Sequence, residues 1–129
     1  MYIQFLGTSS GTPTKSRNVS AIAICESQGA DWYLVDCGEA TQHQILSTPL
    51  SLNSLAGIMI THIHGDHCYG LPGLLASAGM SGRHRPLTII APVGIQPWLQ
   101  ATLEHIQLYL PYEVKFVSVE NLTIQHFGQ

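Results

Sequence analysis

The sequence predicts an α/β chain, of the α+β kind, built on a mixed β-sheet. Three short apolar or alternating segments come first along the 129 residues, and helical segments then alternate with buried apolar runs. A last pair of strand-like segments closes the chain. A chain of this length, with 45% apolar residues, suits one domain with a core of its own.

The first three segments predict strands at residues 2–6, 19–25 and 32–36. A turn-rich loop, residues 7–13, follows the first strand, and a hairpin turn at residues 28–31 leads into the third. We expect this part of the chain to form a sheet before any helix appears.

The rest of the chain predicts helices alternating with strands. The run at residues 55–61 is short and apolar, as in a buried strand, and Pro72 is tolerated in the first turn of the helix after it. We expect helices at residues 39–46, 71–80 and 95–108, and strands at residues 55–61, 87–91, 112–119 and 122–127.

Composition limits the kinds of function. The net charge is −3 with five lysine and arginine residues, which argues mildly against nucleic-acid binding without excluding it. No run of 18 apolar residues occurs, so we expect no membrane span, and the N-terminus lacks the features of a signal peptide. Three cysteines without zinc-finger spacing are most compatible with a reducing cytoplasm.

The segment from His62 to His67 predicts a metal site, because it places three imidazoles and a carboxylate within six residues. His62 and His64 lie two apart after a strand, so both side chains can point to one metal. Gly65 frees the backbone to turn, which can direct Asp66 and His67 to a second metal beside the first. Zinc is the leading candidate, with manganese or iron as alternatives. A polar loop that is merely rich in histidine is the less favoured explanation.

Other polar and thiol residues have two interpretations each. Asp36 could orient a ligating imidazole by accepting its second N–H, or could belong to an acidic turn before a helix. Cys37 and Cys68 are more typical of small core residues than of ligands. The remaining histidines are expected to be surface or helix residues rather than ligands: His43, His84, His105 and His126.

Two further segments are expected to be ordinary loops. The glycine- and serine-rich residues 7–11 could cradle a phosphate through backbone N–H groups, but they lack the ending of a P-loop. Arg83, His84 and Arg85 could meet a polyanion, yet a solvated loop is the favoured interpretation.

The H-x-H-x-D-H run resembles the signature of the metallo-β-lactamase superfamily, and its flanks resemble ribonuclease Z, which matures the 3′ end of transfer RNA. The run D-C-G-E-x-T-Q begins at Asp36, and the run G-L-P-G-L-L begins at Gly70. The similarity covers about the first hundred residues, where Ala40 replaces a usual glycine. Further matching stretches are residues 5–9, 13–14, 17–19, 80–82, 86–89 and 92–95.

The resemblance implies a fold and a chemistry. The chain would be the N-terminal half of an αββα sandwich, a single partial domain over residues 1–129 with helices on one face of its sheet. His62 and His64 would bind the first metal and Asp66 and His67 the second, with Asp66 also handling a proton. Water activated by the metals would cleave precursor transfer RNA. The loop of residues 7–13 and the Arg17 region would form part of the active-site wall.

A chain with only half of this fold would carry only about half of the metal ligands. Two protein ligands per metal fall short of the three that catalytic zinc normally keeps, so we expect this chain alone to be inactive or nearly so. One alternative is a non-catalytic half-domain that self-associates, since an uncovered sheet face and an open edge favour homo-oligomers such as a homodimer. Another is a phosphodiesterase or other metallo-hydrolase of small substrates.

Overall fold

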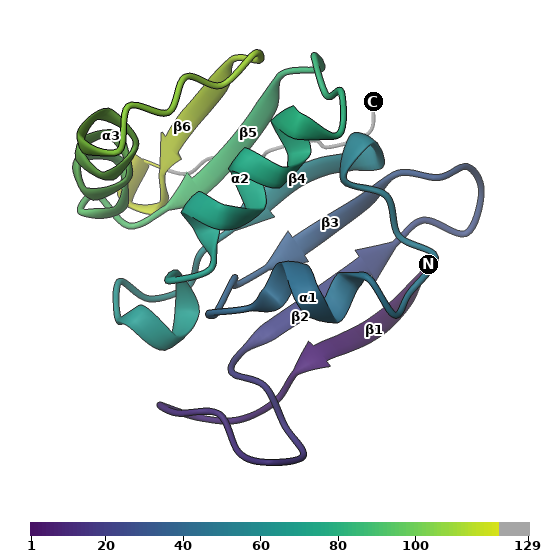
Figure 1. The fold of residues 1–129 in the computed structure, drawn as a ribbon. Helices are drawn as coiled ribbons and strands as arrows, with labels where there is room; N and C mark the ends of the chain where they lie inside the picture. Colours follow the sequence, from purple (N-terminus) through teal and green to yellow (C-terminus); the bar gives the residue numbers. More distant parts are fainter. Residues whose placement is uncertain (122–129) are drawn as a thin grey trace.

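A computed structural model describes residues 1–121 of the chain, which form a six-stranded mixed sheet (Figure 1). The strands lie side by side in the order in which they occur in the sequence. The first three pair antiparallel, and β3 to β6 pair parallel. The strands are β1 (Tyr2–Gly7), β2 (Ala21–Cys25), β3 (Trp32–Val35), β4 (Leu55–Met59), β5 (Leu87–Ala91) and β6 (Val114–Ser118).

Each parallel pair of strands is joined through a helix, as parallel connections require. The helices are α1 (Thr41–Ile45), α2 (Leu71–Met80) and α3 (Ile95–His105), and short 3₁₀ turns occur at η1 (Leu52–Ser54), η2 (Gly65–His67) and η3 (Val119–Asn121). α2 contacts both α1 and α3, so the three helices share one face of the sheet, as expected from the resemblance. No helix within residues 1–121 is both long and apolar enough to cross a membrane.

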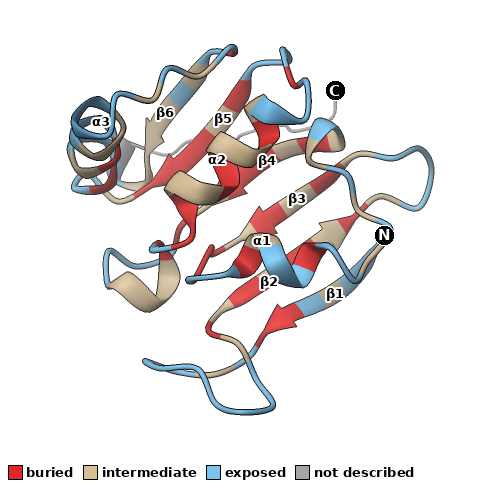
Figure 2. Ribbon diagram, viewed as in Figure 1, coloured by how far each residue is buried: buried red, intermediate tan, exposed pale blue. Residues whose placement is uncertain are grey.

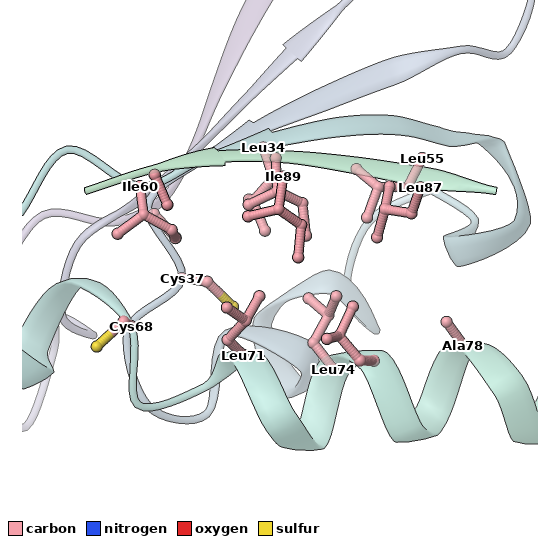
Figure 3. Packing of buried hydrophobic residues seen from close by; sticks show 14 of the residues in the cluster. Leu34, Cys37, Leu55, Ile60, Cys68, Leu71, Leu74, Ala78, Leu87 and Ile89 are labelled. Atoms are coloured by element: carbon pink, nitrogen blue, oxygen red, sulfur yellow. The ribbon is translucent and has the colours of Figure 1, made fainter. Parts of the chain in front are cut away.

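The core lies between the sheet and α2 (Figure 3). Leu71, Leu74, Leu75 and Ala78 recur at helical spacing and are all buried, which places one face of α2 against the strands. The indole of the fully buried Trp32 donates to the carbonyl of Ser51 at 2.7 Å, which satisfies its only donor.

The opposite face of the sheet is apolar, and among the described residues part of it is exposed. Direct cross-strand partners project to the same side, so Ile3 shares that face with Ile24 and Phe5 shares it with Ile22. Ile3 is 59% exposed and Phe5 65% exposed, and Figure 2 shows the exposed part of β1 beside largely buried central strands. We call the outward-facing residues of β1 to β3 the outer face. They are Ile3, Phe5, Ile22, Ile24, Tyr33 and Val35.

The predicted elements exist within residues 1–121, and some bounds differ. The helix expected at residues 39–46 begins only at Thr41, because Ala40 adopts a left-handed backbone with φ of 62°. A glycine would adopt that conformation without strain, which explains why Ala40 is unusual there. The helix expected to reach residue 108 ends at His105, just before Gln107 with its positive φ of 57°. The strand expected at residues 122–127, with His126, lies outside the described residues.

The expectation of a solvated loop at residues 83–85 was wrong for Arg83, which is only 1% exposed. Its guanidinium donates at 2.7 to 3.0 Å to four backbone carbonyls, those of Leu52, Leu55, Arg85 and Pro86. A buried cation is tolerated where its donors are satisfied in this way. Arg83 therefore fastens η1 and the start of β4 to the loop before β5.

Replacing Arg83 with methionine should destabilise the fold by about 3 kcal/mol or more, because buried carbonyls lose their donors. The matched control is Arg85→Met. The side chain of Arg85 is 44% exposed and pairs with Asp31 at 2.9 Å, so its loss should cost about 1 kcal/mol or less. Urea unfolding followed by circular dichroism would measure both values. Equal effects of the two substitutions would contradict this role of Arg83.

Candidate metal centre

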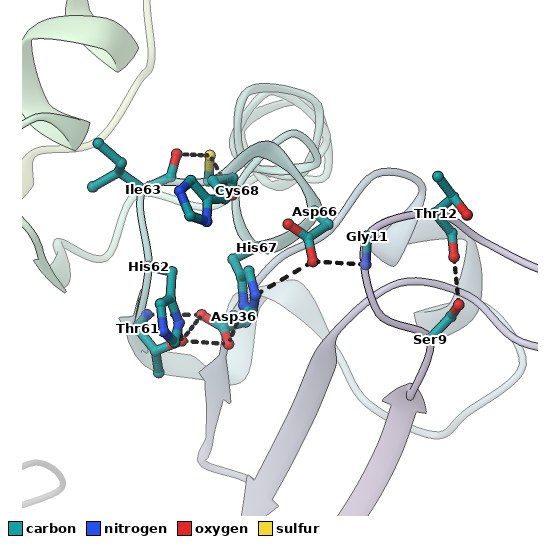
Figure 4. A network of polar contacts seen from close by, with 11 residues as sticks. Ser9, Gly11, Thr12, Asp36, Thr61, His62, Ile63, Asp66, His67 and Cys68 are labelled. Carbon is teal, nitrogen blue, oxygen red and sulfur yellow. Dashed lines mark hydrogen bonds and ion pairs between the residues drawn. The ribbon is translucent and has the colours of Figure 1, made fainter.

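The histidine-rich segment lies at the carboxyl end of β4, where the chain leaves the sheet for α2 (Figure 4). Ile60 is still buried, whereas residues 61–64 are exposed and η2 is half-buried. The strand anchors the segment in the core, and its polar side chains then emerge at the edge of the sheet. This is the edge at which parallel α/β sheets carry their ligand sites.

Asp36, at the end of the neighbouring β3, holds the imidazole of His67. Its Oδ2 lies 2.8 Å from Nδ1 of His67, and Asp36 is 95% buried as a residue, with 5% exposed. A carboxylate partner favours the proton on Nδ1, which leaves Nε2 as the nitrogen that can bind a metal. The structure thus places Asp36 where a residue that orients a ligand would lie.

Thr61 joins Asp36 to the first histidine, a link that the sequence reasoning missed. Asp36 Oδ1 accepts from the backbone N–H of Thr61 at 2.8 Å, and Oδ2 accepts from its hydroxyl, also at 2.8 Å. The same hydroxyl lies 2.8 Å from Nδ1 of His62. Asp36 adopts a positive φ of 61°, and its N–H donates to the Met59 carbonyl at 2.8 Å. One carboxylate therefore restrains two imidazoles.

Asp66 is positioned from the other side, by the loop after β1. The backbone N–H of Gly11 donates to Oδ2 of Asp66 at 3.0 Å, across 55 residues of sequence. This bond is the largest of several contributions, with those of His67 and His64, that hold the pKa of the Asp66 carboxyl below its usual value. The group is therefore ionised near neutral pH, and the loop of residues 7–13 borders the segment.

The imidazole nitrogens and the carboxylate oxygens of the segment are atoms of the types that bind zinc. Oδ2 of Asp66 lies 3.3 Å from Nε2 of His67. Two donors of a tetrahedral zinc, each about 2.0–2.2 Å from the metal, would lie about 3.3–3.6 Å apart. The ring centroid of His62 is 4.7 Å from that of His67 and 6.5 Å from that of His64.

Too few donor atoms come together among the described residues to complete the shell of one metal ion. Within residues 1–121, no three histidine, cysteine, aspartate or glutamate side chains are arranged to hold a metal ion together. The segment therefore offers pairs of donors rather than a complete coordination shell.

The two cysteines next to the segment serve packing, as expected. Cys37 and Cys68 are buried and belong to the hydrophobic core. Burial raises the pKa of the Cys37 thiol to about 12 and also raises that of Cys68, so both stay protonated. The backbone of Cys37 donates to His67 O at 2.8 Å and accepts from Gly70 N at 3.0 Å. These bonds fix the loop after β3 against η2.

The other described histidines are surface or helix residues, as predicted. His43, His84 and His105 are all exposed and lie on α1, in the loop before β5 and at the end of α3. None of the three approaches the segment closely enough to join a metal group among the described residues.

Residues 1–110 match the family model described as anti-Pycsar protein Apyc1. A ribonuclease Z of Pseudomonas putida strain GB-1 is 58% identical over 122 residues, which are 95% of this chain and 38% of the relative. A ribonuclease Z of Marinobacter nauticus is 52% identical over 93% of this chain and 37% of the relative. The chain thus spans less than two fifths of the length of these relatives.

Solved structures also match this chain over less than half of their own length. Human tRNase Z, short form, matches with a TM-score of 0.82 and 34% identity, over 88% of this chain and 42% of that one. The metallo-β-lactamase fold protein YhfI of Bacillus subtilis matches with a TM-score of 0.67 and 21% identity, over 95% of this chain and 49% of its own, which shows the fold alone. The expected resemblance and the expected N-terminal half of the αββα fold are both confirmed.

Asp36→Asn should weaken metal binding about 10- to 100-fold, as loss of an outer hydrogen bond to a metal-binding histidine typically does. Asparagine can still accept from the Thr61 N–H, but its amide nitrogen cannot accept from Nδ1 of His67. Calorimetric titration with zinc sulfate would measure the change. Asp31→Asn, at a carboxylate that pairs with Arg85, is the matched control and should bind as the original chain does. Equal affinities for all three proteins would contradict the role of Asp36.

Proposed function

We propose that this chain, which belongs to the family described as anti-Pycsar protein Apyc1 and is homologous to the N-terminal part of ribonuclease Z, supplies half of the active site of a metal-dependent phosphodiester hydrolase. In a complete protein the reaction would be endonucleolytic 3′ processing of precursor transfer RNA. Residues 1–129 would act as one partial domain. Three free, buried thiols suit a reducing cytoplasm as its compartment.

The observation that carries the proposal is the ordered pair of donors, Asp66 Oδ2 and His67 Nε2, 3.3 Å apart beside the buried Asp36. Zinc is the metal we favour, with manganese or iron as alternatives. Such ions, when bound in pairs, activate water and stabilise charge on a phosphodiester. His62 and His64 would hold the first metal, and Asp66 and His67 the second. Asp66 would also accept or return a proton, and Asp36 would keep His67 oriented.

The substrate side of the proposal rests on the relatives and on one loop. Ribonuclease Z and tRNase Z are the names of the relatives and of a similar structure. Lys15 and Arg17 are exposed on the loop whose Gly11 contacts Asp66, so two of the few cations of the chain lie on the segment that borders the site. Positive charge so placed would attract a phosphate backbone despite the net charge of −3.

A chimera tests whether this half is competent. The chain alone should show no cleavage of precursor transfer RNA, because each metal would have only two protein ligands. Residues 1–122 joined to the remaining part of the ribonuclease Z of P. putida GB-1 should cleave precursor transfer RNA and bis(p-nitrophenyl) phosphate. Product analysis on denaturing gels and release of p-nitrophenol would measure the two activities.

His64→Ala in the chimera should lower both activities at least 100-fold, because one metal loses a ligand. His43→Ala, at an exposed histidine of α1, is the matched control and should leave them unchanged. A folded chimera that cleaves neither substrate would contradict the proposal. Cleavage of only the small phosphodiester would favour the alternative of a small-substrate hydrolase. Robust cleavage of precursor transfer RNA by the chain alone would refute its expected inactivity.

A second candidate function, self-association, is favoured by the outer face. Ile3 and Phe5 are exposed on this face. A pocket of about 560 Å³ on the same face is lined by Ile24, Tyr33 and Met59, among others. Monomeric proteins rarely leave a contiguous apolar patch of this kind uncovered. A second copy of the chain could cover it and form a homodimer or larger homo-oligomer.

Light scattering coupled to gel filtration tests self-association. The original chain should elute as a dimer or larger species at about 100 μM, and Ile3→Lys with Phe5→Lys should convert it to a monomer, because burial of the introduced charges is costly. The matched control is Ile106→Lys with Tyr109→Lys, at exposed positions after α3, which should leave the assembly unchanged. A monomeric original chain at that concentration would remove this candidate.

A further inference from the structure

A pocket beside the histidine-rich segment has no part in holding the donors described above. It has a volume of about 320 Å³, at the lower end of the range for small-molecule sites of about 300–1,000 Å³. Ile63 comes to it from the segment and Tyr69 from the turn between η2 and α2, whereas Ile95 and Trp98 come from α3. We call this the aromatic pocket.

The aromatic pocket and the donor side chains of His62 and His64 lie on opposite sides of the backbone of residues 62–64. Ile63 stands between His62 and His64 in sequence, and alternate residues of an extended segment project to opposite sides. Figure 4 shows Ile63 projecting away from Asp36 and His67. Ile63 and Gly65 both line the pocket and lie between the donors in sequence, so a substrate whose reacting group lies at the histidines can place its next group there.

Tyr69, one of the two aromatic residues of the pocket, is exposed, and its ring rests on the segment. Tyr69 is 63% exposed and Ile63 58% exposed. A Cβ on Gly65 would lie 2.0 Å from the ring of Tyr69, so the ring rests directly on the backbone of Gly65. An exposed aromatic ring that rests on the backbone offers a surface for stacking.

The part of the lining formed by residues 1–121 is also without charge. It carries no lysine, arginine, aspartate or glutamate, and its polar side-chain groups are the Tyr69 hydroxyl, the Trp98 N–H and the Cys68 thiol. A lining of this kind does not suit a phosphate or a sugar alone. It suits a flat group with a large apolar surface.

We propose that the aromatic pocket binds a nucleobase next to the phosphodiester to be cleaved, by stacking on Tyr69 beside Trp98. This inference rests on the proposed function, since that function supplies a nucleotide substrate. Stacking on aromatic side chains accepts every base, because each base has a π-face. The aromatic pocket therefore contributes affinity and position with little preference among bases.

Tryptophan fluorescence reports on this pocket in the chain as it exists. The chain has two tryptophans, and Trp32 is fully buried, so quenching by a nucleotide reports on Trp98. With excitation at 295 nm and no added metal, adenosine 5′-monophosphate and uridine 5′-monophosphate should both quench the emission, with affinities within a few-fold of each other. Ribose 5-phosphate, which has the phosphate but no base, should not. Trp98→Phe should abolish the signal.

Substitutions at tyrosine give the second readout. Tyr69→Leu should weaken nucleotide binding about tenfold, the order of effect that removal of a stacking partner has, and Tyr69→Phe should retain it. Tyr109→Leu, at a tyrosine that is 88% exposed after α3, is the matched control and should change nothing. Quenching by ribose 5-phosphate equal to that by the nucleotides, no quenching by any nucleotide, or unaltered binding by Tyr69→Leu would overturn the inference.

The outcome is separate from that of the proposed function, because this binding requires neither a metal nor the second half of the site. Base-dependent quenching with an inactive chimera would refute the hydrolase proposal and leave the aromatic pocket as a nucleotide site. An active chimera without base-dependent quenching would refute only the aromatic pocket.

Discussion

The carboxylate of Asp36 is the interaction on which the candidate site depends. A buried carboxylate is stable only when hydrogen-bond donors surround it, and here the donors are the N–H and hydroxyl of Thr61 and a ring nitrogen of His67. These partners belong to the end of β4 and to η2. The hydrogen bonds of this one carboxylate therefore hold the ends of β3 and β4 and the η2 turn together. The left-handed backbone at Asp36 is a local cost that these bonds offset.

The same constraint explains why the donors are ordered although they form no complete shell. His67 is oriented through its Nδ1, and Asp66 is held by the Gly11 N–H. Each therefore has a protein partner that fixes it, which is the arrangement expected of a prepared site. The chain covers 38% of a ribonuclease Z relative, and the further ligands that a catalytic site needs would come from elsewhere.

Much of the fold was predictable, because the signals are local. The runs at Leu71–Met80 and Leu87–Ala91 were predicted at the bounds that the structure shows, since each is apolar and flanked by turn residues. Errors occurred where one residue's backbone or burial decides the outcome. The positive φ of Ala40 makes α1 begin later than predicted. The side chain of Arg83 lies in the interior because it donates to carbonyls of η1 and β4, up to 31 residues earlier in the chain. No local pattern reports either event.

The sequence by itself determined the types of the candidate ligands, their spacing and the strand that carries them, because these follow from residues that are neighbours in the chain. It also left two roles open for Asp36. Only the tertiary structure decided that Asp36 meets His67 across 31 residues, that Gly11 meets Asp66 across 55, and that Ile63, Tyr69 and Trp98 enclose one pocket. The physical reason is that these contacts depend on where the ends of separate strands and helices meet, and that position is set by packing of the whole core.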